Sequence, residues 1–249
     1  MSIRRDTGNR AKGNLAQGWG EIHLTGDTAS DFDYVNYHFL KPLAYLLLAP
    51  PHFAFVHAAC IARNGRAIVL CGDATAGKTC LAFACARKGW TFLSGDATHL
   101  LHYSSLHQPG LHQPGEFSVA GRPFSIRFRE SARELFPELN AQPAKVRPNL
   151  KPSIEVDTRK LNLSTALRAR VDHFVFLDRR PDGPARMETI SGDETKRRLD
   201  ETVFFGDETI RLNQRATLHS FASLPSVRLT YSDLHDAEAK LRGLLPDGV

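Results

Sequence analysis

The stretch RAIVLCGDATAGKTCLAFACARKGWTFLSGD, residues 66–96, decides the fold of this chain. Within it, Gly72, Gly77, Lys78 and Thr79 stand at the spacing G-x-x-x-x-G-K-[ST], the phosphate-binding loop known as Walker A. Glycines at these two positions let the loop adopt positive φ and bring its backbone amides close to an anion. The lysine supplies an ammonium for the outer phosphates of a nucleotide, and the threonine hydroxyl can ligate Mg²⁺.

The segments on either side of the loop are those that such a site requires. Residues 67–71 form an apolar run typical of a buried strand, and residues 78–88 are rich in Ala and end at Gly89, as a helix does. The dipole of a helix in this place points at bound phosphates. A structural turn that happens to fit the spacing is the alternative. We predict an ATP site whose contacts come from Gly72, Asp73, Ala74, Thr75, Ala76, Gly77, Lys78, Thr79 and Cys80.

An acidic residue follows the next apolar run. Residues 90–96 (WTFLSGD) read as a second buried strand that ends at Asp96. An aspartate at the end of the strand after a P-loop helix usually completes the Mg²⁺ site. We therefore predict that Thr79 and Asp96 hold the metal.

The run before the loop predicts a β-hairpin. Residues 53–62 are apolar and β-prone, and Asn64-Gly65 separates them from the strand at 67–71. The hairpin places His57 on the strand beside the P-loop strand. A histidine in an apolar run is more often a core residue, and a role in the site is the second interpretation.

Composition is that of an ordinary globular protein. The 249 residues carry a net charge of +5, and the pI is about 9.1, which suits an anionic ligand such as ATP without arguing for nucleic acid. The four cysteines show no metal-ligand spacing and indicate a reducing, cytoplasmic setting.

The membrane-like run at 42–62 is cut by Pro50-Pro51, so we expect a helix ending near residue 49 and no membrane span.

The ends and the middle of the chain show less order. Residues 1–20 are basic and without periodicity, which predicts a flexible tail before a single domain at 21–249. The tandem LHQPG at 106–110 and 111–115 predicts a pliable loop. His102, His107 and His112 suggest a metal site, but the Pro-Gly turns of the repeat disfavour a fixed ligand geometry. Strands are predicted at 171–178 and 226–231, and helices at 193–204, 210–224 and 232–245.

Basic residues gather in two further places. Arg127 and Arg129 alternate with apolar residues, so they share one strand face, either solvated or facing phosphate. The proline-rich run at 142–160 contains Lys145, Arg147 and Lys151, which could close over phosphates. Binding of nucleic acid through these charges is disfavoured because no aromatic interleaving accompanies them.

The order of these motifs resembles the catalytic domain of HPr kinase/phosphorylase, which is related in fold to PEP carboxykinase. The likeness covers roughly residues 55–129, with VHAACIARNGRAIVLCGDATAGKT as one block and FSIRF (124–128) as a degenerate form of the family's Glu-x-Arg signature. It implies an α/β P-loop domain with a mixed sheet flanked by helices. It also implies that Lys78 binds the β- and γ-phosphates, that His57 lies near the transferred phosphate and that Arg127 faces phosphate.

Two positions depart from the pattern of that family. Gly95 stands where the family has its first acid, which looks like the general base, and Ser125 stands where it has the signature glutamate. An acceptor hydroxyl must then be activated by Asp96, His57 or Asp73. Base catalysis contributes about 10²–10⁴-fold, so its loss would cripple a kinase without preventing ATP binding.

We therefore expect an ATP- and Mg²⁺-dependent kinase that phosphorylates a hydroxyl of a protein, peptide or small molecule. The alternative is an ATP-binding regulator, a pseudokinase that transfers nothing. The family assembles into rings, so a homo-oligomer is plausible, although nothing in the sequence marks an interface.

Overall fold

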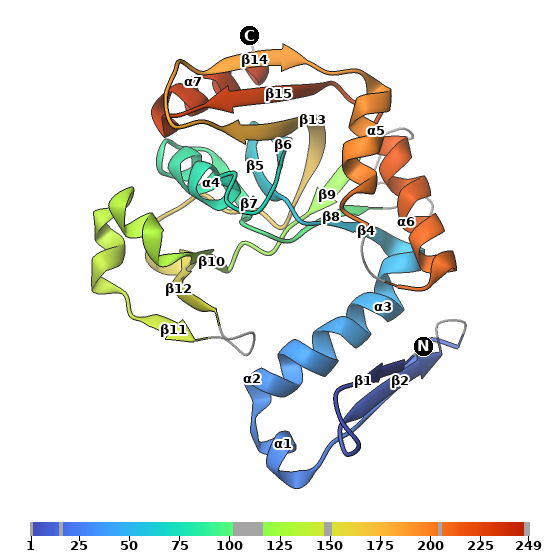
Figure 1. The fold of residues 1–249 in the computed structure, drawn as a ribbon. Helices are drawn as coiled ribbons and strands as arrows, with labels where there is room; N and C mark the ends of the chain where they lie inside the picture. The colour runs from blue at the N-terminus through green and yellow to red at the C-terminus, as the bar shows by residue number, and fades with distance from the viewer. Residues whose placement is uncertain (1, 15–16, 102–116, 147–150, 204–205, 247–249) are drawn as a thin grey trace.

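A large mixed sheet forms the centre of the protein (Figure 1). The computed structural model describes residues 2–14, 17–101, 117–146, 151–203 and 206–246. Within them, nine strands run in the order β4-β8-β9-β13-β6-β5-β7, with β15 also paired to β13 and β14 paired to β15. Their bounds are β4 (Phe53–Val56), β5 (Ala59–Arg63), β6 (Arg66–Cys71), β7 (Thr91–Ser94), β8 (Thr98–Leu101), β9 (Ser118–Ala120), β13 (Arg168–Arg179), β14 (Arg186–Thr189) and β15 (Ser226–Tyr231).

The hairpin predicted before the phosphate loop is present. β5 and β6 pair antiparallel from Ala59↔Leu70 to Arg63↔Arg66. The two turn residues, Asn64 at φ 52° and Gly65 at φ 75°, both adopt the left-handed conformation that a two-residue hairpin requires. On its other side β6 runs parallel to β13, which makes β6 an interior strand of the sheet.

Helices cover both faces of this sheet. Alternate residues of β6 explain why: Ile68 and Leu70 join one buried cluster, and Val69 and Cys71 join the other. The first cluster includes residues of α4 (Lys78–Arg87) and α7 (Leu234–Leu244), and the second includes residues of α5 (Gly192–Asp200) and α6 (Glu208–Phe221). The chain is therefore an α/β protein of three layers, and the strands and helices predicted after residue 170 are confirmed to within a few residues.

Strands occupy the first residues of the chain, where the sequence predicts a flexible tail. β1 (Ser2–Arg4), β2 (Arg10–Asn14) and β3 (Trp19–His23) pair antiparallel into a separate small sheet. Ala11 is buried in a cluster with Phe39 and Leu43, so the sheet packs on the helix that follows. The prediction of an unstructured tail is wrong for the described residues, because these short, polar strands carry little apolar periodicity and gain their order from that packing.

A bent helix connects the small sheet to the central one (Figure 1). After α1 (Gly26–Ser30), the chain runs through α2 (Phe32–Val35), the π-helix η1 (Asn36–Leu40) and α3 (Lys41–His52) without a break. The widened turn precedes Pro42, which has no N–H to donate and whose ring would clash with the carbonyl one turn back. The backbone of α3 continues to His52, so the helix end predicted near residue 49 is wrong by three residues. Among the described residues, no helix combines the length and the apolar character that crossing a bilayer demands.

A second small sheet packs beside α4. It has the order β10-β12-β11, with β10 (Ser125–Phe128), β12 (Pro152–Asp157) and β11 (Ala144–Val146), and short 3₁₀ turns at Glu130–Glu134, Pro137–Ala141 and Thr158–Lys160. Ile126 and Phe128 enter the α4 cluster, and Phe83 of α4 lies 5.1 Å from the Phe128 ring. The LHQPG repeat with His107 and His112, together with His102 and Arg147, lies outside the described residues.

Candidate functional site

The loop predicted to bind phosphate joins β6 to α4, as expected from the sequence. Gly72 has φ 144° and Gly77 has φ 86°, and Thr75 between them is also left-handed at φ 81°. A Cβ at Gly72 would lie 3.1 Å from the carbonyl oxygen of Leu177, and one at Gly77 would collide with the hydroxyl of Tyr231. Both glycines are therefore required by close packing of the loop as well as by its backbone conformation.

Lys78 lies across the loop. Its Nζ donates to the carbonyl oxygens of Gly72 at 2.7 Å and Asp73 at 2.9 Å, and the side chain is buried. Burial lowers the pKa of this lysine, and the nearby Asp73 and Asp96 carboxylates act in the opposite direction. An ammonium held in this way can exchange its carbonyl partners for phosphate oxygens without moving far.

Thr79 and Asp96 come together at the end of β7. The Thr79 Oγ1 donates to the carbonyl oxygen of Gly95 at 2.8 Å, and Asp96, the next residue, is exposed. Since the hydroxyl hydrogen is used by Gly95, the lone pairs of Oγ1 are left to face a cation. A hydroxyl and a carboxylate are the hard oxygen ligands that Mg²⁺ prefers, so the residues present fit the predicted metal.

The other residues of the predicted nucleotide contact set follow the loop. Asp73, Ala74 and Thr75 are exposed, and Ala76, Gly77 and Cys80 are half-buried. Ala76 accepts a hydrogen bond of 2.7 Å from the Tyr231 hydroxyl, and its own N–H donates to Asp73 O at 3.1 Å. The exposed side of the loop is thus the side on which its backbone could meet an anion.

His57 lies elsewhere than predicted. It occupies the bend between β4 and β5, where it is exposed, so the expectations of a strand position and of a core residue are wrong. The Thr98 hydroxyl donates to Ala58 O at 2.8 Å and fixes this bend against β8. Surrounding protein and the positive charge of Lys78 lower the pKa of His57, which favours the neutral imidazole, while Asp96 acts in the opposite direction.

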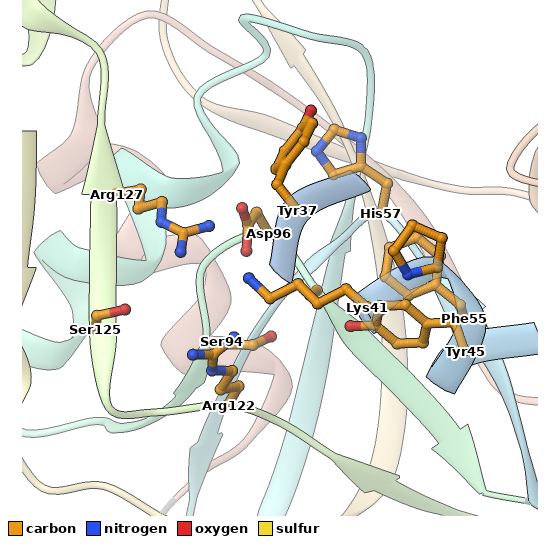
Figure 2. Close-up of a pocket in the computed structure, with 12 residues that line it drawn as sticks. Tyr37, Lys41, Tyr45, Phe55, His57, Ser94, Asp96, Arg122, Ser125 and Arg127 are labelled. Atoms are coloured by element: carbon orange, nitrogen blue, oxygen red, sulfur yellow. The ribbon is translucent and has the colours of Figure 1, made fainter. Parts of the chain in front are cut away.

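A cavity of about 350 Å³ opens beside Asp96 and His57 (Figure 2). Four parts of the chain contribute its walls: the bent helix, the β4–β5 region, the end of β7, and the segment that enters β10. The lining residues are Tyr37, Lys41, Pro42, Tyr45, Phe55, His57, Ser94, Asp96, Ala97, Arg122, Ser125 and Arg127.

Of the two arginines predicted to share a strand face, only Arg127 lines the cavity. It is half-buried on β10, and its Nε lies 3.5 Å from Glu155 Oε2 on the neighbouring strand β12. Arg129 follows the end of β10 and is exposed, but it lies near enough to Lys78 to lower the pKa of that lysine. Lys145 and Lys151 are exposed and do not line the cavity.

Sequence reasoning missed the helical wall of the cavity and Arg122. Tyr37, Lys41 and Tyr45 recur every four residues, the spacing that places side chains on one face of a helix. That spacing was visible in the sequence, but nothing local indicated that this face meets Asp96. Arg122 precedes β10, and no motif or periodicity around it in the sequence indicates a site residue.

Comparisons with known proteins add little. The chain matches no family model, and no curated protein matches it in sequence. A solved structure of the Hpr(Ser) kinase/phosphatase from Coxiella burnetii aligns with 77% of this chain and 93% of its own, at 12% identity and a TM-score of 0.37. A TM-score of this size does not establish a common fold.

Proposed function

We propose that this protein is an ATP- and Mg²⁺-dependent phosphotransferase of the HPr kinase type, which transfers the γ-phosphoryl group to a hydroxyl. One observation carries the proposal: the bond from Thr79 to Gly95 O holds the P-loop hydroxyl next to Asp96, and Asp96 also lines a cavity that could admit an acceptor. A P-loop that served only as a turn would have no need of this arrangement.

Each residue then has a role in positioning. Backbone amides between Gly72 and Cys80 and the Lys78 ammonium bind the phosphates, and Thr79 and Asp96 hold the metal. Bound there, Mg²⁺ would supply neutralisation of phosphate charge. Arg127 faces the cavity beside Asp96, where a guanidinium can bind oxygens of the transferred group (Figure 2).

His57 is the general base in this proposal. Asp73 does not line the cavity, and Asp96 is committed to the metal, whereas the neutral His57 lines the cavity with Asp96. The imidazole accepts the proton as the acceptor oxygen bonds to the γ-phosphorus. The bond to the bridging oxygen breaks, and ADP leaves with the electron pair.

The test is Mg²⁺-dependent ADP release together with calorimetric titration of ATP. We expect Lys78→Ala to abolish release and to weaken ATP binding. The matched control is Lys240→Ala, an exposed lysine of α7, which should change neither quantity. Release that is unchanged in Lys78→Ala would rule out the proposal.

A regulator that binds ATP without transfer is the second candidate, because Gly95 and Ser125 replace acids expected from the resemblance. ATP binding without ADP release, with acceptors present, would favour it. Restoring the acid by Gly95→Asp is a poor test, since a Cβ there would lie 3.3 Å from Thr79 Cγ2 and press on the metal site.

A further inference from the structure

The cavity beside Asp96 carries more positive than negative charge. Lys41, Arg122 and Arg127 line it, against the single acid Asp96. Glu155, which lies outside the lining, offsets part of the charge of Arg127. If Asp96 holds a divalent cation, the remaining lining is cationic. Three cations gathered around one cavity repel one another, so an anion bound among them is favoured.

The three cations come from two distant parts of the chain and line one space. Lys41 projects from the bent helix, and Arg122 and Arg127 come from the segment at β10 (Figure 2). The π-helix η1 ends at Leu40, directly before Lys41, and such turns are frequent at functional sites. The planar guanidinium of an arginine can hold a carboxylate or a phosphate by two parallel hydrogen bonds.

The side of the cavity that carries Lys41 is also aromatic, and it faces Arg127 (Figure 2). The Tyr45 ring stacks on His99 with centroids 5.6 Å apart and contacts Phe55 at the same distance. Tyr45 and Phe55 both line the cavity, as does Tyr37. This wall suits an apolar or aromatic body, since aromatic rings bury large areas and prefer such contacts.

We propose that this cavity is the acceptor pocket and that its substrate is a small organic anion carrying a hydroxyl group. The inference rests on the proposed function, which supplies the phosphoryl group. The anion, a carboxylate or a phosphate, binds Arg122 and Lys41, the apolar body lies on the wall of Tyr45, and the hydroxyl lies toward Asp96 and His57. The volume of about 350 Å³ is near the lower limit of the roughly 300–1,000 Å³ of small-molecule sites, which disfavours a protein loop.

The experiment uses pairs of probes, each an anion and a neutral analogue without the anionic group. 3-Phenyllactate is compared with 3-phenylpropane-1,2-diol, and glycerol 3-phosphate with glycerol, by calorimetric titration of the full-length protein without nucleotide. We expect one anion to bind at least about tenfold more tightly than its neutral partner, the size of one charge-assisted hydrogen bond. The pair that shows the difference identifies carboxylate or phosphate as the recognised group.

Variants locate the effect. Arg122→Gln should reduce the ratio of the affinities for the anion and for its neutral partner to near one. Lys41→Gln is a second, independent test if the first variant folds poorly. Arg211→Gln removes the same charge from an exposed position of α6 outside the cavity, and it should leave the ratio unchanged. A general loss of folding would weaken both members of a pair alike, so the ratio separates the two causes.

Outcomes for the proposed function are read separately, from ATP binding and its dependence on Lys78. Equal binding of anions and neutral partners, with Lys78-dependent ATP binding intact, would overturn the acceptor pocket and leave the kinase proposal standing. Anion binding in a protein that does not bind ATP would overturn both. Lys78-dependent phosphorylation of the preferred anion is the result expected if both are correct.

Discussion

Thr79 donates its hydroxyl hydrogen to the backbone carbonyl of Gly95 at 2.8 Å, which joins the first turn of α4 to the end of β7. Gly95 is buried, so its carbonyl depends on this donor. The same bond positions the Thr79 oxygen beside Asp96. Stability and the proposed metal binding therefore depend on one hydroxyl, and they can be tested together.

Thr79→Val keeps the shape of the side chain and removes the hydroxyl. We expect the free energy of unfolding to fall by about 1–3 kcal/mol, because a buried carbonyl loses its donor. The gain in ATP affinity that Mg²⁺ confers should disappear as well. Denaturant unfolding measures the first effect, and ATP titrations with Mg²⁺ or with EDTA measure the second. Thr79→Ser, which retains the hydroxyl, should keep both, and Mg²⁺ dependence that survived in the valine variant would exclude Thr79 as a ligand.

Gly77 and Tyr231 form a second coupled pair. The Tyr231 hydroxyl donates to Ala76 O at 2.7 Å, and it occupies the space that a Cβ at Gly77 would need. Gly77→Ala should destabilise the protein by about 1–3 kcal/mol, since it adds strain at positive φ to this collision. Tyr231→Phe should cost about 1 kcal/mol. The double variant should lose less than the sum, because removing the hydroxyl makes room for the methyl group. Additive losses in denaturant unfolding would contradict a direct contact.

The segment from 66 to 96 could be predicted because its determinants are local. Gly72 and Gly77 mark the loop, the apolar runs on either side mark the strands, and Asn64-Gly65 marks the hairpin turn. Each of these signals lies within a few residues of the structure it specifies. The unbroken apolar run of β6, which helices cover on both faces, belongs to the same class of signal.

The cavity could not be predicted because it depends on contacts between distant segments. Lys41 and Asp96 line one cavity because the bent helix packs against β4, and Arg122 joins them because β10 packs beside α4. The sequence predicts a strand position for His57, but β4 ends at Val56. The bend that contains His57 is fixed by the hydrogen bond from Thr98 to Ala58, which are 40 residues apart. The strands of the N-terminal sheet were missed for a similar reason, because their order comes from the helix that follows them.

Glu238 provides a test of the core on one side of the sheet. It is 3% exposed and accepts hydrogen bonds from Trp90 Nε1 at 2.8 Å, Lys88 Nζ at 3.1 Å and Arg242 Nη2 at 2.5 Å. Burial alone would raise the pKa of this carboxyl, but these donors outweigh burial and lower it. The charged carboxylate thus ties α7 to the end of α4.

Glu238→Gln should lower the free energy of unfolding at pH 7 by about 1–3 kcal/mol, because Trp90, Lys88 and Arg242 lose their charged, buried acceptor. A lowered folded pKa contributes stability that is present above the ordinary value of about 4.5 and is lost as pH falls through the folded pKa. The difference between the variant and the unaltered protein should therefore shrink in acid. Denaturant unfolding between pH 3 and pH 7 measures this. Glu208→Gln, at an exposed position of α6, should cost less than about 0.5 kcal/mol throughout, and a constant difference for Glu238→Gln would show that charge is not responsible.

The last prediction concerns how activity depends on pH through His57. Its pKa lies below the usual 6.5, because surrounding protein and Lys78 disfavour the imidazolium, so a base at this position is neutral and competent at pH 7. Activity should therefore hold at pH 7 and fall as pH drops through that lowered pKa. His57→Gln should reduce ADP release by about 10²–10⁴-fold and remove the acidic limb of the kcat/KM profile that His57 causes. His235→Gln, an exposed histidine of α7, should retain both the rate and the limb. If His57→Gln slowed release but kept the same acidic limb, the titrating base would be another group, and Asp96 would be the residue to test next.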